Sequence, residues 1–306
     1  MPVMPAVFQN LKLPVIGSPL FIISNPALLI AQCKAGIVGA MPALNARPSS
    51  QLDDWLAEIT ASLAGGEPYA INLIAHKSNA RLDEDLAVCE KYKVPIVITS
   101  LGAREEINRA VHAWGGVTLH DVIHNTFAHK AVEKGADGLI AVAAGAGGHA
   151  GTRSPFALVQ EIRQWFDGPL VLSGAIATGG AVLAAQAMGA DLAYIGSPFI
   201  ATREANASDA YKQAIVDASS DDIVYSNLFT GVHGNYLAAS IRNAGLDPAN
   251  LPSDARDYAA GAPRPWKDIW GSGQGVGVVD EVVPAAAFIE RLAAQYQAAR
   301  ARLLGA

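Results

Sequence analysis

The residues with the clearest chemical potential form one short stretch, Gly145-Ala146-Gly147-Gly148-His149-Ala150-Gly151, in which a single histidine sits among glycines. Glycine allows a ligand to come close to the main chain. An unperturbed histidine titrates near neutral pH, so it can take up and release a proton there. The stretch directly follows the apolar run Gly138–Ala144, which is typical of a buried strand. We therefore predict a site at the end of a strand; a tight turn whose histidine points to solvent is the alternative.

Two other glycine-containing turns suit an anion. One is Ser173-Gly174-Ala175, which leads toward a helix-like stretch, and the other is Gly196-Ser197, at the end of the last apolar run. Main-chain N–H groups at a helix start, with small hydroxyl side chains beside them, can hold a phosphate without a lysine. We expect the phosphate of a cofactor at these turns. The alternative is that their glycines serve only as turn residues between strand and helix.

The elements that must position these residues repeat one unit along the chain. Short apolar or β-branched runs alternate with stretches of helical periodicity, which predicts strands and helices in turn. Capping residues and prolines open several of the helices, at Asn25-Pro26, Pro48-Ser49-Ser50 and Ser154-Pro155. The predicted strands are Leu13–Ile16, Gly36–Ala40, Tyr69–Ala75, Val94–Ser100, Gly116–His120, Gly138–Ala144, Leu170–Ile176 and Leu192–Ser197.

Continuously apolar strands that alternate with helices indicate a parallel sheet covered on both faces. Eight such units are the number that closes a (β/α)8 barrel, so we predict an α/β fold of the TIM-barrel type rather than a doubly wound sheet. In such barrels the chemistry lies at the carboxyl ends of the strands, and a phosphate commonly lies after strands seven and eight. The histidine stretch and both glycine turns follow strands in this way.

The alternation stops after residue 203, which predicts three parts: a barrel over 1–203, a smaller and mostly helical insertion over 204–275, and a closing segment over 276–306. The amphipathic stretch Pro284–Leu304 is the expected closing helix. We expect the insertion to lie over the barrel mouth as a substrate or lid domain. Trp266 and Trp270 either line that lid or pack into its core.

Composition limits the partners. Hydrophobic residues make up 51% of the 306 positions, charged residues 16%, and the formal net charge is −6, which argues against nucleic-acid binding. Cys33 and Cys89 lack zinc-type spacing, so we expect reduced core thiols and no metal. The uncharged stretch 168–190 is broken by proline and glycine, which argues against a membrane span. The first residues show no secretory signal, which makes the cytoplasm the expected location.

Five motifs, in this order, resemble those of the nitronate monooxygenase (2-nitropropane dioxygenase-like) FMN flavoprotein family. The resemblance extends over nearly the whole chain and concerns a family that also contains flavin enoyl-carrier-protein reductases and NAD(P)H:quinone reductases. The motifs are Pro14-Val15-Ile16-Gly17-Ser18-Pro19, Ala35-Gly36-Ile37-Val38-Gly39, Gly147-Gly148-His149-Ala150-Gly151, Ser173-Gly174-Ala175-Ile176-Ala177 and Gly196-Ser197-Pro198-Phe199.

The resemblance implies a barrel that binds FMN. It implies that the two glycine turns hold the FMN phosphate, that Pro19 and Asn72 lie beside the isoalloxazine, and that His149 faces its reactive edge. Gly273-Gln274-Gly275 resembles the segment at the outer edge of the flavin. The residues expected to bind the cofactor are Pro19, Asn72, Gly147, Gly148, Ser173, Gly174, Ala175, Gly196, Ser197 and Gln274.

This chain departs from the family at three places. Leu20 stands where a methionine is common, Gly145 where an acidic residue is often found, and Asp121 where some members have lysine. FMN binding is compatible with these changes. They bear on the substrate and on any use of a reduced nicotinamide.

The activity that the resemblance implies is oxidation of a small nitro compound or its nitronate with O2, which gives a carbonyl compound and nitrite. His149 would be the base that removes the proton next to the nitro group. An NAD(P)H-dependent flavin reductase acting on a quinone or an enoyl thioester is the alternative enzyme. An alternative outside the enzymes is a barrel that binds a phosphorylated ligand and catalyses no redox reaction. The chain could also assemble as a homodimer.

Overall fold

Parallel strands alternate with helices in the computed structural model, which describes residues 4–252 and 263–305. Within this part of the chain the main sheet has eight strands in the order β1-β9-β8-β6-β5-β4-β3-β2. They are β1 (Val15–Gly17), β2 (Gly39–Pro42), β3 (Tyr69–Ile74), β4 (Ile96–Ser100), β5 (Val117–Val122), β6 (Gly138–Val142), β8 (Leu170–Ser173) and β9 (Leu192–Ile195).

The two edges of this sheet come together and close it into a barrel. The Gly17 N–H donates to the Val38 carbonyl at 2.8 Å, and the Val38 N–H donates to the Val15 carbonyl at 3.1 Å. All neighbouring strands of this sheet are parallel, as the apolar runs required. The prediction of a TIM-barrel-like α/β fold is confirmed.

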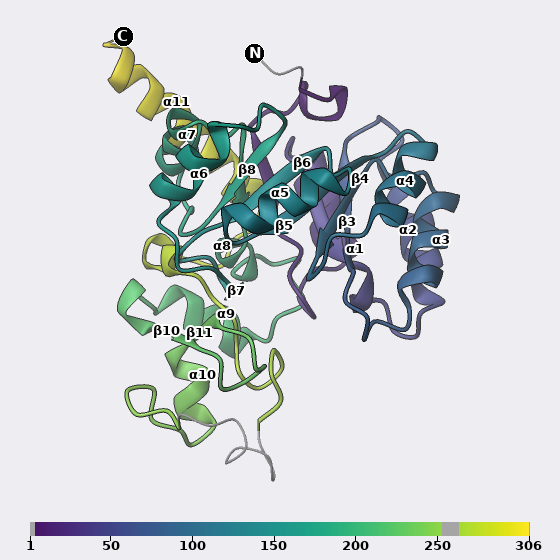
Figure 1. The fold of residues 1–306 in the computed structure, drawn as a ribbon. Helices are drawn as coiled ribbons and strands as arrows, with labels where there is room; N and C mark the ends of the chain where they lie inside the picture. The colour runs from purple at the N-terminus through teal and green to yellow at the C-terminus, as the bar shows by residue number, and fades with distance from the viewer. Residues whose placement is uncertain (1–3, 253–262, 306) are drawn as a thin grey trace.

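Helices cover the outside of the barrel (Figure 1). Of the three predicted helix starts, Asn25 caps its helix with a side chain that accepts the Leu28 N–H at 2.8 Å, whereas Ser50 and Ser154 precede their helices without such a hydrogen bond. Thr178, which was not predicted as a cap, accepts the Ala181 N–H at 3.2 Å. Among the described helices, none has both the length and the apolar character needed to cross a bilayer. The helices that accompany the barrel strands are α1 (Pro26–Lys34), α2 (Gln51–Ser62), α3 (Leu82–Lys91), α4 (Glu105–Ala113), α5 (Asn125–Glu133), α6 (Pro155–Arg163), α7 (Gly179–Met188), α8 (Ser197–Ile200) and α11 (Ala285–Leu304).

The barrel interior is filled by one side of each strand. Inward positions such as Ala70, Ile98, Leu119 and Leu192 form a single buried cluster, whereas neighbouring positions such as Ile71 pack outward against the helices. Because side chains alternate along a strand, the next inward position lies two residues further on, closer to the carboxyl end. Cys33 and Cys89 are buried and unpaired, as expected.

The segment after the barrel contains α9 (Asp209–Val216), β10 (Ile223–Ser226), β11 (Gly234–Leu237), α10 (Ala238–Asn243) and the short helix η5 (Gln274–Val278). The stretch Tyr236–Ala244 is helix-like in sequence, but Tyr236 belongs to β11 and the helix begins at Ala238. The reason is that β11 finds a strand on each side, β10 and the two-residue β7 (Gly148–His149). Residues 253–262 of the predicted insertion lie outside the described residues, and the three-part division stays a proposal.

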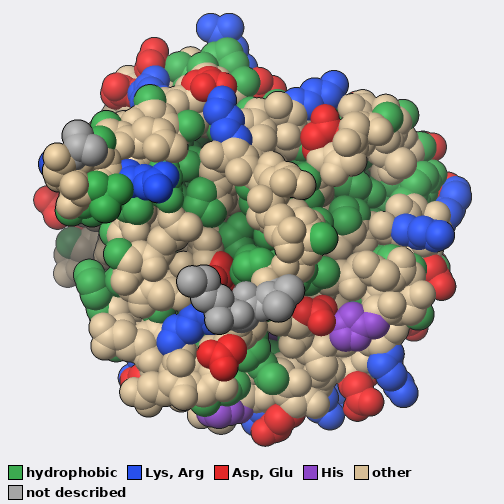
Figure 2. Space-filling view, turned by 90° about the horizontal axis from the view of Figure 1, so that it is seen from above, with side chains coloured by type: hydrophobic (Ala, Val, Ile, Leu, Met, Phe, Trp, Pro, Cys, Tyr) green, Lys and Arg blue, Asp and Glu red, His purple; other side chains and the backbone are tan. Residues whose placement is uncertain are grey.

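The inserted segment lies at one end of the barrel, beside β7 (Figure 1). Figure 2 shows the molecule from above, which is the side away from this segment. On that face lysine, arginine and acidic side chains are interspersed among apolar ones rather than gathered into a basic stripe. This mixture agrees with the formal net charge of −6.

Candidate active site

A cavity with a volume of about 1190 Å³ lies over the carboxyl ends of the barrel strands. Pockets for one small ligand usually measure about 300–1,000 Å³, so this cavity is large enough for a cofactor and a second molecule. The predicted site residues that line it are Pro19, Asn72, Gly147, Gly148, His149, Ser173, Gly174, Ala175, Gly196 and Ser197. Gln274 is not among the lining residues, although Gly273 and Gly275 on either side of it are.

The glycine turns after β8 and β9 adopt tight conformations. Gly174 has a φ of +138°, and a Cβ atom added to it would lie 2.7 Å from the Ala144 carbonyl oxygen. Only glycine fits this position without displacing the main chain of the neighbouring strand end. The Ser197 Oγ accepts the Gly273 N–H at 2.8 Å, which fastens the 272–275 segment to the start of α8 and leaves the hydroxyl proton of Ser197 for another acceptor.

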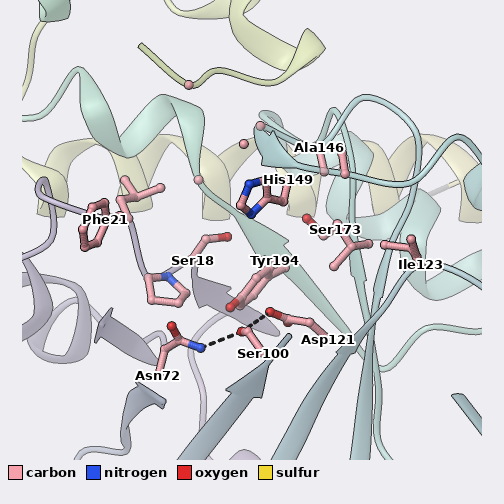
Figure 3. A pocket seen from close by; sticks show the side chains of 18 of the residues that line it. Ser18, Phe21, Asn72, Ser100, Asp121, Ile123, Ala146, His149, Ser173 and Tyr194 are labelled. Atoms are coloured by element: carbon pink, nitrogen blue, oxygen red, sulfur yellow. Dashed lines mark hydrogen bonds between the residues drawn. The ribbon is translucent and has the colours of Figure 1, made fainter. Parts of the chain in front are cut away.

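Four polar side chains form what we call the cavity floor: Asn72, Ser100, Asp121 and Tyr194. Each lies two residues beyond an apolar residue of the interior cluster, so the strand period turns all four inward. The Asn72 Nδ2 donates to the Ser100 Oγ at 2.7 Å, and the Ser100 Oγ donates to the Asp121 Oδ2 at 2.5 Å. Figure 3 shows this chain of hydrogen bonds running across the bottom of the cavity, with Tyr194 beside it.

The floor holds an acid in an apolar setting. Burial raises the pKa of Asp121 to about 6, although the hydrogen bond from Ser100 lowers it in part. The second carboxyl oxygen of Asp121 and the hydroxyl of Tyr194 are buried and have no hydrogen-bond partner among the described residues. Burial, and then the charge of Asp121, raise the pKa of Tyr194 well above its usual value. Asp121 can therefore change its charge just below neutral pH.

Three side chains form what we call the cavity mouth: His149, Thr230 and Trp266. His149 belongs to β7, which is paired with β11 so that His149 lies opposite Gly234. The His149 Nε2 lies 3.1 Å from the Thr230 Oγ1, and the Trp266 ring meets the imidazole edge-on at a centroid distance of 5.3 Å. In Figure 3 His149 lies above the floor residues, across the cavity from Asn72.

The main chain around His149 is held in place more firmly than a glycine-rich loop suggests. Besides the β7–β11 pairing, the Asn235 Nδ2 donates to the Ala146 carbonyl at 2.6 Å. Burial lowers the pKa of His149, so the imidazole is neutral at neutral pH and able to accept a proton. The alternative of a turn with a solvent-pointing histidine does not describe this half-buried, paired residue.

The other histidines have different surroundings. His76 and His233 also line the cavity. The His120 Nδ1 lies 2.6 Å from the Thr99 Oγ1, and burial lowers the pKa of His120 to about 4. The His124 Nδ1 accepts the Phe127 N–H at the start of α5, which is a capping contact. His149 alone among these five combines β7 pairing with a lowered pKa at the mouth.

Of the two tryptophans in the inserted segment, one lines the cavity and the other packs against a neighbouring ring. Trp266 lines the cavity against His149, whereas Trp270 stacks on Tyr211 at a centroid distance of 4.6 Å. Tyr194 and Thr230 were not predicted. The position of Tyr194, two residues after Leu192 in a predicted strand, was a usable signal. For Thr230 the sequence contains none, because its contact with His149 spans 81 positions.

Comparisons with known proteins agree with this arrangement. The model of the nitronate monooxygenase family matches residues 48–295. A nitronate monooxygenase from Paraburkholderia phytofirmans is 25% identical over 77% of this chain and 76% of its own length. A (3aS,4S,5R,7aS)-5-hydroxy-7a-methyl-1-oxo-octahydro-1H-indene-4-carboxyl-CoA dehydrogenase from Rhodococcus jostii is 25% identical over 76% of this chain, which spans 64% of that relative.

Solved structures extend the similarity to the whole barrel. FabK from Thermotoga maritima has a TM-score of 0.81 at 24% identity, with 98% of this chain and 97% of that chain covered, a likeness that concerns the fold. The nitroalkane oxidase from Streptomyces ansochromogenes has a TM-score of 0.80 at 26% identity, with 98% of this chain and 100% of that chain covered. Together with the family match over residues 48–295, these findings show that the chain belongs to the nitronate monooxygenase family and is an oxidoreductase of the flavin-dependent kind.

Proposed function

We propose that this chain is an FMN-dependent nitronate monooxygenase, which oxidises small nitro compounds or their nitronates with O2 to carbonyl compounds and nitrite. The observation that carries the proposal is His149, a neutral base held rigidly at the mouth of a large cavity. A nitroalkane must lose the proton next to its nitro group before oxidation, and a base tuned to stay unprotonated at neutral pH suits that step.

The residues present fit FMN. Gly174 and Ser197 both line the cavity at turns after strands, where main-chain N–H groups can meet a phosphate, and Ser197 has a hydroxyl proton free to donate. Pro19, Asn72 and Ser173 line the same cavity and would hold the rest of the cofactor. When bound, FMN supplies the electron transfer.

The chain's own residues supply the acid–base chemistry and the surroundings. His149 would accept the carbon-bound proton of a nitroalkane and hold the resulting nitronate by a charge-assisted hydrogen bond. Trp266 and Val232 cover the mouth with apolar surface, which keeps water from the reacting carbon. A substrate added as the nitronate needs no proton removal, so His149 has less to do for it.

One observation favours a second candidate, an NAD(P)H-dependent reductase of an enoyl thioester. The lining of the cavity continues outward over three exposed apolar side chains, Leu101, Ile123 and Phe127. Lys130, Glu133 and Lys134 also belong to the lining, so two cations and one carboxylate accompany this apolar surface. An extended apolar lining suits a long substrate better than it suits a small nitroalkane.

An anaerobic experiment separates the two candidates. The flavin-loaded protein is mixed with propyl 2-nitronate, NADH or NADPH without oxygen, and loss of the flavin absorbance is followed. The monooxygenase proposal expects bleaching within seconds by the nitronate and much slower bleaching by either nicotinamide. Fast bleaching by NADPH with a slow response to the nitronate would overturn it in favour of the reductase. Chromatography of the cofactor released from the same sample should identify FMN; FAD would contradict the phosphate assignment to Gly174 and Ser197.

A further inference from the structure

The Thr230 hydroxyl stands at the centre of a small hydrogen-bond cluster at the cavity mouth. Its Oγ1 lies 3.1 Å from the His149 Nε2, 3.2 Å from the Tyr236 hydroxyl and 2.9 Å from the Val232 carbonyl oxygen. The Val232 N–H also points to this oxygen, at 3.4 Å. Tyr236 is fully buried, and Thr230 is the partner of its hydroxyl. Thr230 therefore connects the inserted segment to the one histidine of β7.

The protons of this cluster can be assigned by counting. A threonine hydroxyl has one proton to donate, and a carbonyl oxygen can only accept. The Val232 carbonyl, at the shortest of the three distances, takes the Thr230 proton. The Thr230 oxygen is then only an acceptor for its remaining neighbours, and it has two lone pairs for them. The His149 Nε2 and the Tyr236 hydroxyl, at 3.1 and 3.2 Å, are the nearer two and donate to it, whereas the contact from the Val232 N–H, at 3.4 Å, is the weakest of the three. A neutral imidazole with a proton on Nε2 has none on Nδ1.

Nothing else in the described surroundings of His149 competes for this choice. Burial is the cause of its lowered pKa, with no contribution from a neighbouring charge. The Trp266 ring lies at right angles to the imidazole with the two centroids 5.3 Å apart, and the β7–β11 pairing involves the main chain of His149. The nearest titratable group in the cluster is the Tyr236 phenol, whose pKa burial raises, so it stays a neutral donor.

We propose that Thr230 is a positioning residue, whose hydroxyl accepts the Nε2–H of His149 and thereby makes Nδ1 the atom that receives the substrate proton. The assignment of the tautomer stands on the cluster alone. The role of Nδ1 as the receiving atom rests on the proposed function. In that step the substrate's C–H bond breaks, its electron pair remains on the nitronate, and the proton forms an N–H bond at Nδ1.

The tautomer is measured by nitrogen NMR on protein labelled at histidine, with the His149 signals assigned by their loss in His149→Ala. Wild type should show the Nε2–H form as the dominant neutral species. Thr230→Val, which keeps the shape but removes the acceptor, should populate both tautomers. Thr230→Ser restores the hydroxyl and should restore the wild-type pattern. Tyr236→Phe removes a hydroxyl of the same cluster that does not touch His149, and should leave the tautomer unchanged.

Kinetics test the second half of the proposal. Thr230→Val should lower kcat for a neutral nitroalkane by about tenfold, the size expected for one lost hydrogen bond, with KM nearly unchanged. Turnover of the preformed nitronate should change much less. A merely structural defect would slow both substrates together. If Thr230→Val folds poorly because it leaves the Tyr236 hydroxyl unpartnered, the double variant with Tyr236→Phe removes that penalty and the same comparison holds.

The outcomes are distinct. A dominant Nδ1–H form in wild type, or a tautomer unmoved by Thr230→Val, would overturn the positioning role. If the tautomer responds as expected but wild type turns over neither nitroalkane nor nitronate, the positioning role stands and the proposed function fails. Equal slowing of both substrates by Thr230→Val would overturn the assignment of Nδ1 as the receiving atom.

Discussion

The polar residues on the cavity floor come from strands of one barrel. At the mouth, His149 lies in a separate small sheet, and Thr230, 81 positions further on, lies in the connection between β10 and β11 of that sheet. On the floor, the strand period alone turns Asn72, Ser100 and Asp121 toward each other. At the mouth, His149 depends on β11 for its main chain and on Thr230 for its side chain. Changes at the mouth should therefore alter the position of a base, and changes on the floor should alter a charge.

The largest effect is expected for His149→Ala. This variant should retain the barrel and the flavin but slow turnover of a neutral nitroalkane by roughly 10²–10⁴-fold, the usual range for a positioned base. The preformed nitronate should be affected less, because its proton is already gone. Steady-state kinetics on both substrates provide the measurement, and flavin absorbance provides the control for cofactor binding. Wild-type rates on both would mean that the mouth has no part in proton transfer.

Gly234→Ala tests whether the strand pairing at the mouth matters for the base. A Cβ at this position would lie 2.8 Å from the Gly148 carbonyl oxygen, so it must push β11 away from β7 and shift His149. Because small displacements of a reacting group are costly, we expect kcat for a nitroalkane to fall by up to about 10²-fold. Gly277→Ala, where the nearest atom is 3.7 Å from the added Cβ, is the matched control and should keep its activity.

The same pair of variants sharpens the comparison between the two regions. Gly234→Ala should leave the titration of the floor unchanged, since Asp121 belongs to the barrel strand β5. The titration can be followed by carbon NMR of labelled aspartate. A moved Asp121 signal in Gly234→Ala would show that mouth and floor are coupled and would contradict their separation.

The smallest effect is expected for Asp121→Asn, read as stability against pH. The pKa of Asp121 is raised from 3.8 to about 6, so the unfolded chain loses this proton first and the folded chain becomes less stable as pH rises through that window. Asp121→Asn has no titrating carboxyl at this position, so its stability does not show this decrease with rising pH. Between about pH 5 and pH 8 its stability should gain about 1.4 kcal/mol relative to wild type.

Chemical denaturation of both proteins at several pH values gives this difference, in which the other titrating groups cancel. Ser100→Ala removes the hydroxyl that donates to Asp121, so the pKa of that carboxyl should rise further and the window should extend to higher pH. A difference between wild type and Asp121→Asn that stays flat across the range would mean that Asp121 is solvated like a surface carboxylate.

The sequence predicted the barrel well because its signals are local. Each strand was a short apolar run, and caps such as Asn25 act on residues only three positions away. The strand ends followed from the same reasoning, so the lining positions Asn72, Gly174 and Ser197 could be named in advance. Their role in cofactor binding stays a prediction.

The mouth was harder to predict because its contacts are distant along the chain. His149 was expected on a loop, and it became part of β7 only because β11 offers hydrogen bonds to it. The expectation that Gln274 lies beside the flavin stays a prediction; its side chain packs against Gly145, in the space that a side chain of residue 145 would take. Neither pairing leaves a pattern in a short window of sequence, since two-residue strands have no period to detect.

The pairing of β7 with β11 also limits how this chain can be recombined with its relatives. If the proposed insertion is exchanged to seek a new substrate range, the eight-stranded sheet stays intact while residues that line the cavity, such as Thr230 and Trp266, are replaced. In this chain the insertion also contains the strand and the hydroxyl that hold His149. A slip of one residue in β11 would reverse which of its side chains face the cavity. A chimera that takes the inserted segment from one parent and residues 145–151 from another thus combines two halves of the structure that holds His149, and these halves must match for the histidine to keep its position.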